Sequence, residues 1–129
     1  MSEETPVVIL CIDDDPKALM ARRLLLSSAG YDALAAGSGE QALRILLRRD
    51  VRLVIADAFL PHITAAEMTA QIKRFNPRIL VVLLTAVSEL PSGATQADLV
   101  LIKGMAPADF LARIAALLAG EASAEASAP

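Results

Sequence analysis

Residues 54–57, Val54-Ile55-Ala56-Asp57, form an apolar run that stops at a single carboxylate. Three other apolar runs also end in polar side chains: residues 7–12 lead into Asp13-Asp14-Asp15, residues 79–84 into Thr85, and residues 99–102 into Lys103. Short runs of this kind, rich in Val and Ile, are typical of strands buried on both faces. If the strands are parallel, their carboxyl ends share one sheet edge, where open α/β sheets bind ligands. We therefore expect these polar side chains at one site, with Asp57 in its middle.

Helix-start signals stand between the runs. They are Asp15 followed by Pro16, Ser38 with Gln41, Thr64 with Glu67, and Pro107. Gly30 is placed to close the first helix, and Asn76-Pro77 to end the third. The side chains expected to face the core are Leu19, Met20, Leu24 and Leu26, then Leu43, Leu46 and Leu47, and finally Phe110, Leu111, Ile114, Leu117 and Leu118. The pattern therefore predicts strands that alternate with amphipathic helices.

Three segments complete the predicted domain. Residues 31–36 form a weaker strand of the kind found at a sheet edge, and residues 87–97 contain Pro91 and Gly93, which predicts a short or irregular fourth helix. Residues 121–129 contain only Ala, Ser, Glu and Pro, which predicts a disordered tail or the root of a linker after a domain of residues 1–120. Alternating strands and helices indicate an α/β fold with a parallel sheet and helices on both faces.

Composition restricts the function classes. The 129 residues carry 12 basic and 15 acidic side chains, so a net charge of -3 gives no overall attraction to nucleic acid. We interpret Arg22-Arg23 and Arg48-Arg49-Arg52 as solvated helix faces. A single cysteine, Cys11, lies inside an apolar run and suits a reducing compartment. No run approaches the roughly 20 apolar residues of a membrane span, so we expect a soluble cytoplasmic protein.

Three carboxylates at one sheet edge, Asp13, Asp14 and Asp57, repel one another unless a cation is present or their pKa values rise. A hard divalent ion with oxygen ligands, Mg²⁺ first, meets that need and commonly shares a site with phosphate. Lys103 and Thr85 offer an ammonium and a hydroxyl to phosphate oxygens. An aspartate held in such a place can act as a nucleophile and form an acyl phosphate. The residues thus indicate a phosphorylatable aspartate.

The ordered motifs Ile12-Asp13-Asp14-Asp15-Pro16, Asp57 with Leu60-Pro61, Leu84-Thr85-Ala86, and Lys103 resemble the receiver domains of two-component response regulators, the CheY-like family. The resemblance covers roughly residues 7–119. It implies a flavodoxin-like doubly wound fold with five parallel strands in the order 2-1-3-4-5. It also implies site roles: Asp57 accepts a phosphoryl group, Asp13, Asp14, Asp57 and the Phe59 carbonyl bind Mg²⁺, and Thr85 and Lys103 contact the phosphate.

The resemblance also implies partners. The phosphoryl donor would be a sensor histidine kinase or a histidine phosphotransfer protein, and the downstream protein target is not specified by the motifs. We expect no enzyme activity, no binding of nucleic acid by this domain alone, no membrane contact and a possible homodimer. His62 is interpreted as a solvated loop residue.

Four positions depart from the family pattern. Thr64-Ala65 replaces a usual Asp-Gly, Gly104 replaces a proline usually joined by a cis bond, and Val100 replaces an aromatic residue that often turns inward on activation. The fourth departure is a shortened segment between Thr85 and Lys103. A non-proline cis bond costs about 2.5–4 kcal/mol, so we expect a trans bond at Gly104.

These departures keep two alternatives open. The first is a degenerate receiver that acts as a phosphorylation-independent binding or dimerisation module. The second is a small Mg²⁺-dependent phosphatase, because Asp13 and Asp15 have the alternate spacing that such enzymes use. The chain lacks room for a substrate cap, however, and Lys17 stands where such an enzyme would carry Thr or Val.

Overall fold

The computed structural model describes residues 5–86 and 96–127, with side chains described up to residue 120. Its central sheet has five parallel strands in the order β2-β1-β3-β6-β7. The strands are β1 (Val8–Ile12), β2 (Asp32–Ala36), β3 (Leu53–Asp57), β6 (Leu80–Thr85) and β7 (Leu99–Ile102). The predicted order 2-1-3-4-5 is therefore confirmed, because β6 and β7 are the fourth and fifth strands of this sheet.

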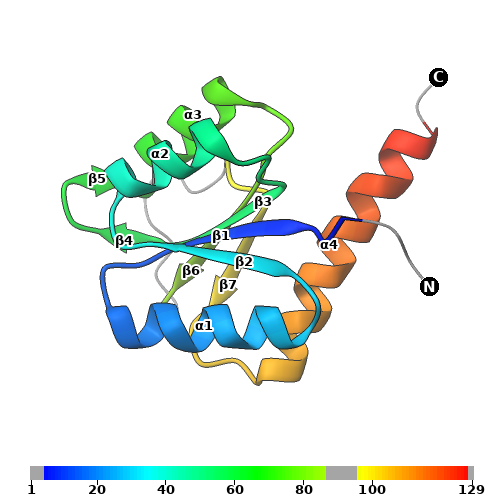
Figure 1. Cartoon of the computed structure of the whole chain (residues 1–129), viewed down its shortest axis with the longest axis horizontal. Coiled ribbons are helices and arrows are strands. Elements are labelled where there is room, and N and C mark those ends of the chain that lie inside the picture. Colours follow the sequence, from blue (N-terminus) through cyan, green and yellow to red (C-terminus); the bar gives the residue numbers. More distant parts are fainter. Residues whose placement is uncertain (1–4, 87–95, 128–129) are drawn as a thin grey trace.

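The helices cover both faces of the sheet, as the alternating pattern predicted. They are α1 (Pro16–Ser28), α2 (Gly39–Arg48), α3 (Ala65–Phe75) and α4 (Pro107–Ser127). In Figure 1, α2 and α3 lie on one side of the sheet, and α1 and α4 lie on the other. The doubly wound α/β fold is thus observed.

The predicted caps form, with one difference in detail. Asp15 accepts a hydrogen bond from the Lys17 amide at 3.0 Å, and Thr64 and Glu67 make a reciprocal capping box. Ser38 accepts from the Gln41 amide, but the Gln41 side chain accepts from the Gly37 amide at 2.7 Å instead of from Ser38. The starts of α1, α2 and α3 are therefore fixed by local sequence.

Strand alternation divides the buried side chains into two cores. Leu10 and Ile12 of β1 pack on the side of α2 and α3, whereas Ile9 and Cys11 pack on the side of α1 and α4. The same alternation continues in β3 and β6, because successive side chains of a strand point to opposite faces. Each core is completed by helix residues, for example Met68 on one side and Ile114 on the other.

Part of the predicted helix packing is wrong. Met20 and Leu24 of α1 are 52% and 62% exposed, and Leu43 and Leu47 of α2 are 48% and 67% exposed. The inward stripe of α1 instead contains Leu19, Arg22 and Leu26, which follow one another at helical spacing. The inward residues of α2 are Ala42 and Leu46. Apolar residues on several sides of α1 made its orientation ambiguous from sequence.

Two further segments differ from the predictions. Helix α4 continues to Ser127, past Gly120, because the Ala- and Glu-rich segment consists largely of good helix formers. A two-residue antiparallel pair, β4 (Phe59–Leu60) and β5 (Ile63–Thr64), follows β3 and was not predicted. Most of the predicted irregular helix of residues 87–97 lies outside the described residues.

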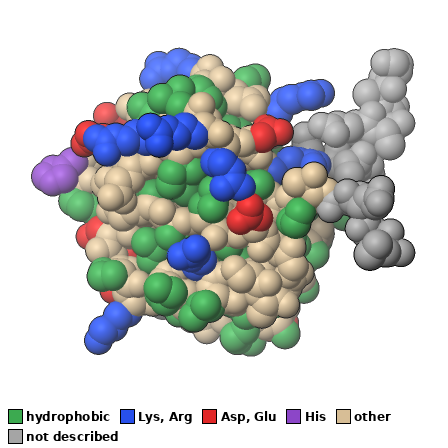
Figure 2. Space-filling model, in the orientation of Figure 1, with side chains coloured by type: hydrophobic (Ala, Val, Ile, Leu, Met, Phe, Trp, Pro, Cys, Tyr) green, Lys and Arg blue, Asp and Glu red, His purple; other side chains and the backbone are tan. Residues whose placement is uncertain are grey.

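The surface carries mixed charge. In Figure 2, Lys and Arg side chains are scattered over one face among acidic and hydrophobic side chains. Within the described residues, no helix combines the length and the hydropathy needed to cross a membrane.

Candidate functional site

The register of the sheet brings the predicted site residues to one edge. Ile12 pairs with Ala56, Asp57 with Leu84, and Thr85 with Ile102. Asp13 and Lys103 directly follow two of these positions. The parallel strands therefore end together, and the polar residues that follow them meet at their carboxyl ends.

Three carboxylates form the centre of this site. Oxygen atoms of Asp13, Asp14 and Asp57 all lie within 4.8 Å of one another. Asp13 and Asp57 are buried, whereas Asp14 is exposed and opens onto a hollow of about 590 Å³ beside the β4–β5 hairpin. Such a set of oxygen ligands, partly open to water, fits a hard divalent cation such as Mg²⁺.

Asp57 is held by two donors. Its Oδ1 accepts a hydrogen bond from the Phe59 amide at 2.9 Å, and its Oδ2 lies 2.8 Å from Lys103 Nζ. Gly104, next to that lysine, has φ of 89°, and no peptide bond among the described residues is cis. Lys103 therefore reaches Asp57 without the proline that the family usually has after it.

Thr85 lies at the end of β6 and is buried. Its hydroxyl donates to the Ala86 carbonyl at 3.1 Å, and its own carbonyl accepts from the Lys103 amide at 2.7 Å. The backbone thus ties the threonine and the lysine together beside Asp57. Val100, the position without an aromatic ring, is half-buried against the core on the α2 and α3 side.

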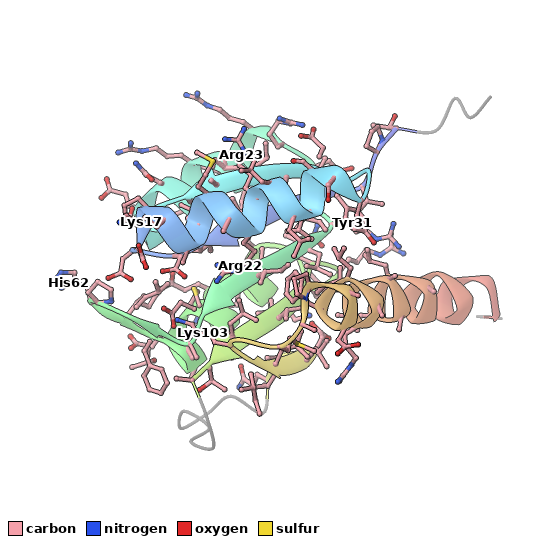
Figure 3. The ribbon with its side chains drawn as sticks, turned by 90° about the horizontal axis from the view of Figure 1, so that it is seen from below. Lys17, Arg22, Arg23, Tyr31, His62 and Lys103 are labelled. Carbon is pink, nitrogen blue, oxygen red and sulfur yellow. The ribbon has the colours of Figure 1, made fainter. Side chains whose placement is uncertain are left out.

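Sequence reasoning missed one residue of the site, Arg22. Its Nη1 lies 3.3 Å from Asp13 Oδ2, and its side chain is only 12% exposed. The interpretation as a solvated face is therefore wrong for Arg22. Arg23 is exposed, as predicted, and its Nε donates to the Ala33 carbonyl at 3.0 Å. Figure 3 shows the two side chains leaving opposite sides of α1. The signal available in the sequence was the spacing of four residues between Arg22 and Leu26, which places both side chains on one face of α1.

Arg22 and Lys103 also line a common cavity. It has a volume of about 330 Å³ and lies between α1 and the segment that leads from β7 into α4. Its walls are otherwise mostly apolar and include Leu25, Met105 and Phe110. Each cation thus contacts an acid on one side and this cavity on the other.

Two other chemical groups lie apart from the acids. His62 is at the tip of the β4–β5 hairpin, pointing away from the site in Figure 3, and its φ is 71°. Burial raises the pKa of Cys11 from 9.0 to about 12, although Arg22 and Arg23 pull it down in part. A thiol with so high a pKa carries almost no reactive thiolate near neutral pH.

The family model of the response regulator receiver domain matches residues 9–115. The chain belongs to this family. Among curated relatives, the transcriptional regulatory protein GlrR of Escherichia coli is 38% identical over 93 residues, which are 70% of this chain and 21% of GlrR. The chain therefore spans about a fifth of that relative.

Solved receiver structures share the fold. A CheY-like receiver domain protein of Methanospirillum hungatei superimposes with a TM-score of 0.84 over 92% of this chain and 98% of that one, at 22% identity. The response regulator TrrA of Thermotoga maritima, in complex with Mg²⁺ and BeF, has a TM-score of 0.78 over 86% of this chain and 98% of its own, at 26% identity. TrrA is also known in complex with the histidine kinase ThkA.

Proposed function

We propose that this receiver domain accepts a phosphoryl group on Asp57 from a sensor histidine kinase or a histidine phosphotransfer protein. The observation that carries the proposal is the position of Asp57, which lies within 4.8 Å of two further carboxylates and 2.8 Å from Lys103. The complex of the related TrrA with a histidine kinase supports this class of partner.

The transfer is a substitution at phosphorus. A carboxylate oxygen of Asp57 forms the new P–O bond while the P–N bond of a phosphohistidine breaks. The electron pair of that bond stays on the imidazole nitrogen. Because the other ring nitrogen of the reacting phosphohistidine carries a proton, the leaving group is neutral histidine. Before transfer, the Phe59 amide and Lys103 hold the carboxylate in one orientation. After transfer, the acyl oxygens no longer carry the negative charge, so the ammonium of Lys103 moves to a phosphoryl oxygen.

Asp13, Asp14, Asp57 and the backbone carbonyl of Phe59 are the proposed Mg²⁺ ligands. The bound ion supplies positive charge to the phosphoryl oxygens during transfer. Asp14 is the ligand open to solvent, while buried Asp13 is positioned by the Asp15 amide at 2.9 Å. Mg²⁺ in the TrrA complex supports this choice of metal.

Thr85 is proposed to move toward the phosphoryl group and to donate a hydrogen bond from its hydroxyl to a phosphoryl oxygen. In the described conformation that hydroxyl bonds to the Ala86 carbonyl, so closure requires a local rotation. The added charge of a phosphoryl group biases the strand-end loops between two arrangements. Because Val100 replaces the usual aromatic residue, we propose that the signal is passed to a protein target through these loops and not through ring rotation. The signalling unit is proposed to be residues 1–120.

A degenerate receiver is the second candidate, favoured by Val100 and Gly104. In that case the domain binds its partner, or a second copy of itself, with equal affinity whether or not Asp57 is phosphorylated. A phosphatase is not favoured, because the acid site lies within a chain that matches the receiver family over residues 9–115.

The test is intact mass after incubation with Mg²⁺ and acetyl phosphate. We expect one phosphoryl adduct in the wild type, none in Asp57→Asn and none with EDTA. Asp15→Asn is the matched control, because it removes a neighbouring acid outside the three-carboxylate set and should still give the adduct. An adduct that persists in Asp57→Asn would rule out the proposed acceptor. The absence of an adduct in the wild type, after a trial with a phosphorylated histidine phosphotransfer protein, would leave only the degenerate receiver.

A further inference from the structure

We propose that Arg22 is an internal cation that competes with Mg²⁺ for Asp13 and thereby sets the metal affinity of the site. The inference rests on the proposed function, because it assumes that Asp13 is a metal ligand. It concerns a residue of α1 whose guanidinium reaches the acid site from the side of the α1–α4 cavity.

The contacts of Asp13 are the first argument. Both of its oxygens are occupied: Oδ1 accepts from the Asp15 amide at 2.9 Å, and Oδ2 pairs with Arg22 at 3.3 Å. The carboxylate is only 1% exposed, so it depends on protein groups for its polar contacts. A cation that takes Asp13 as a ligand must therefore displace the guanidinium or share Oδ2 with it. Both outcomes weaken cation binding.

The charge of the site is the second argument. Asp13, Asp14 and Asp57 contribute three negative charges, and Arg22 and Lys103 return two positive ones, so the net local charge is -1. Without Arg22 the same set has a net charge of -2, which attracts a divalent ion more strongly. Arg22 therefore lowers the affinity of the unphosphorylated site for metal.

The cavity provides the third argument, because it gives the guanidinium a place to go. Arg22 already lines the space of about 330 Å³ between α1 and the start of α4, so the side chain can turn into it while α1 stays in position. The long stem of arginine can remain against the apolar wall there. Metal binding would then place a free positive charge in the cavity beside Met105 and Phe110.

Isothermal titration calorimetry with Mg²⁺ tests the proposal. Arg22→Met removes the charge while retaining a long apolar side chain, and Arg23→Met is the matched control. It removes an equal charge one position along α1 from a side chain that bonds to a carbonyl instead of an acid. We expect Arg22→Met to bind Mg²⁺ about tenfold more tightly than the wild type, and Arg23→Met to bind as the wild type does. Equal affinities of the wild type and the two variants would overturn the proposal.

A second measurement uses the wild type and so does not depend on the folding of a variant. In a titration with Mg²⁺, the Nε–Hε NMR resonance of Arg22 should shift with the same saturation curve as the backbone amide resonances of Asp13 and Asp14. The Nε–Hε resonance of Arg23 should not shift. An Arg22 resonance that does not respond at saturating Mg²⁺ would contradict competition for Asp13.

The two proposals fail in different ways. If the wild type binds Mg²⁺ and Arg22→Met binds it more tightly but neither is phosphorylated, the phosphoacceptor proposal fails and the role of Arg22 stands. If phosphorylation proceeds and the affinities are equal, only the role of Arg22 fails. If only Arg22→Met binds Mg²⁺, the competition is complete and the inference is supported. If no variant binds the metal, both proposals fall.

Discussion

Replacement of Asp14 by asparagine should stabilise the metal-free protein. Asp14 contributes a negative charge within 4.8 Å of Asp13 and Asp57, yet it has no ion pair of its own among the described residues. Its two neighbours are already paired, one with Arg22 and the other with Lys103. Asp14 is therefore the carboxylate whose charge costs most in the absence of a metal.

The size of the effect follows from Coulomb's law. At the 4.8 Å limit, two unit charges repel by about 0.9 kcal/mol in bulk water and by about 3.5 kcal/mol at an effective dielectric constant of 20. Because Asp14 is exposed, the lower value applies, and two such pairs give about 2 kcal/mol. At physiological ionic strength the Debye length is about 8 Å, so salt screening reduces this repulsion at 4.8 Å to about half. We therefore expect a gain of about 1 kcal/mol, or about 3–5 °C in Tm for a chain of this size.

The assay is urea and thermal unfolding in EDTA, repeated with saturating Mg²⁺. In EDTA the Asp14→Asn variant should be more stable than the wild type, and Mg²⁺ should stabilise the wild type far more than the variant. High salt should shrink the gain, because the Debye length falls to about 3 Å at 1 M. Asp15→Asn serves as the control, since asparagine still caps α1 and the removed charge lies outside the cluster. An equal gain in Asp15→Asn, or no gain in Asp14→Asn, would refute the reasoning.

Three further predictions concern stability alone. Thr69 is fully buried in α3, and among the described residues its hydroxyl has no hydrogen-bond partner. Thr69→Val should therefore raise the free energy of unfolding, measured in urea, by about 1 kcal/mol, whereas Thr69→Ser should lower it. His62→Gly should raise the free energy of unfolding by about 0.5 kcal/mol in the same assay, because glycine removes the backbone strain of φ at 71° but loses more chain entropy on folding. His62→Ala should show no increase, because alanine keeps that strain. The raised pKa of Cys11, about 12 against 9.0, means that above pH 9 the unfolded thiol loses its proton while the folded thiol keeps it. The stability contributed by Cys11 should therefore be complete below pH 9 and fall by up to about 1.4 kcal/mol per pH unit above it. The measurement compares the free energy of unfolding of the wild type and of Cys11→Ala between pH 9 and 10.5. A wild-type stability that declines no faster than that of the variant would contradict the raised pKa of Cys11.

Local sequence was sufficient to predict the five strands of the central sheet and the starts of the described helices. The apolar runs before Asp13, Asp57, Thr85 and Lys103 are strands, because buried parallel strands need continuous apolar segments. The helix starts could also be predicted from local sequence, because capping depends on two side chains a few residues apart. The β4–β5 hairpin was missed because each of its strands has only two residues, too short for any periodic pattern.

The meeting of the site residues was also determined by sequence. Once the strands alternate with helices, the sheet is parallel, and residues that follow the strands must lie at one edge. The carboxylate cluster and the contact between Lys103 and Asp57 follow from that constraint. Membership of the receiver family could likewise be inferred from the ordered motifs, and it is borne out by the match over residues 9–115.

Tertiary structure decided how each helix is rotated against the sheet, and with it the charge of the site. In α1, apolar residues occur on several sides, so periodicity alone could not separate buried Leu26 from exposed Met20 and Leu24. The rotation that buries Leu26 also turns Arg22 inward to Asp13. Pairing between residues of different elements depends on this long-range packing. The sequence therefore determined which acids meet and that Lys103 joins them, and only the packed fold determined that Arg22 pairs with Asp13.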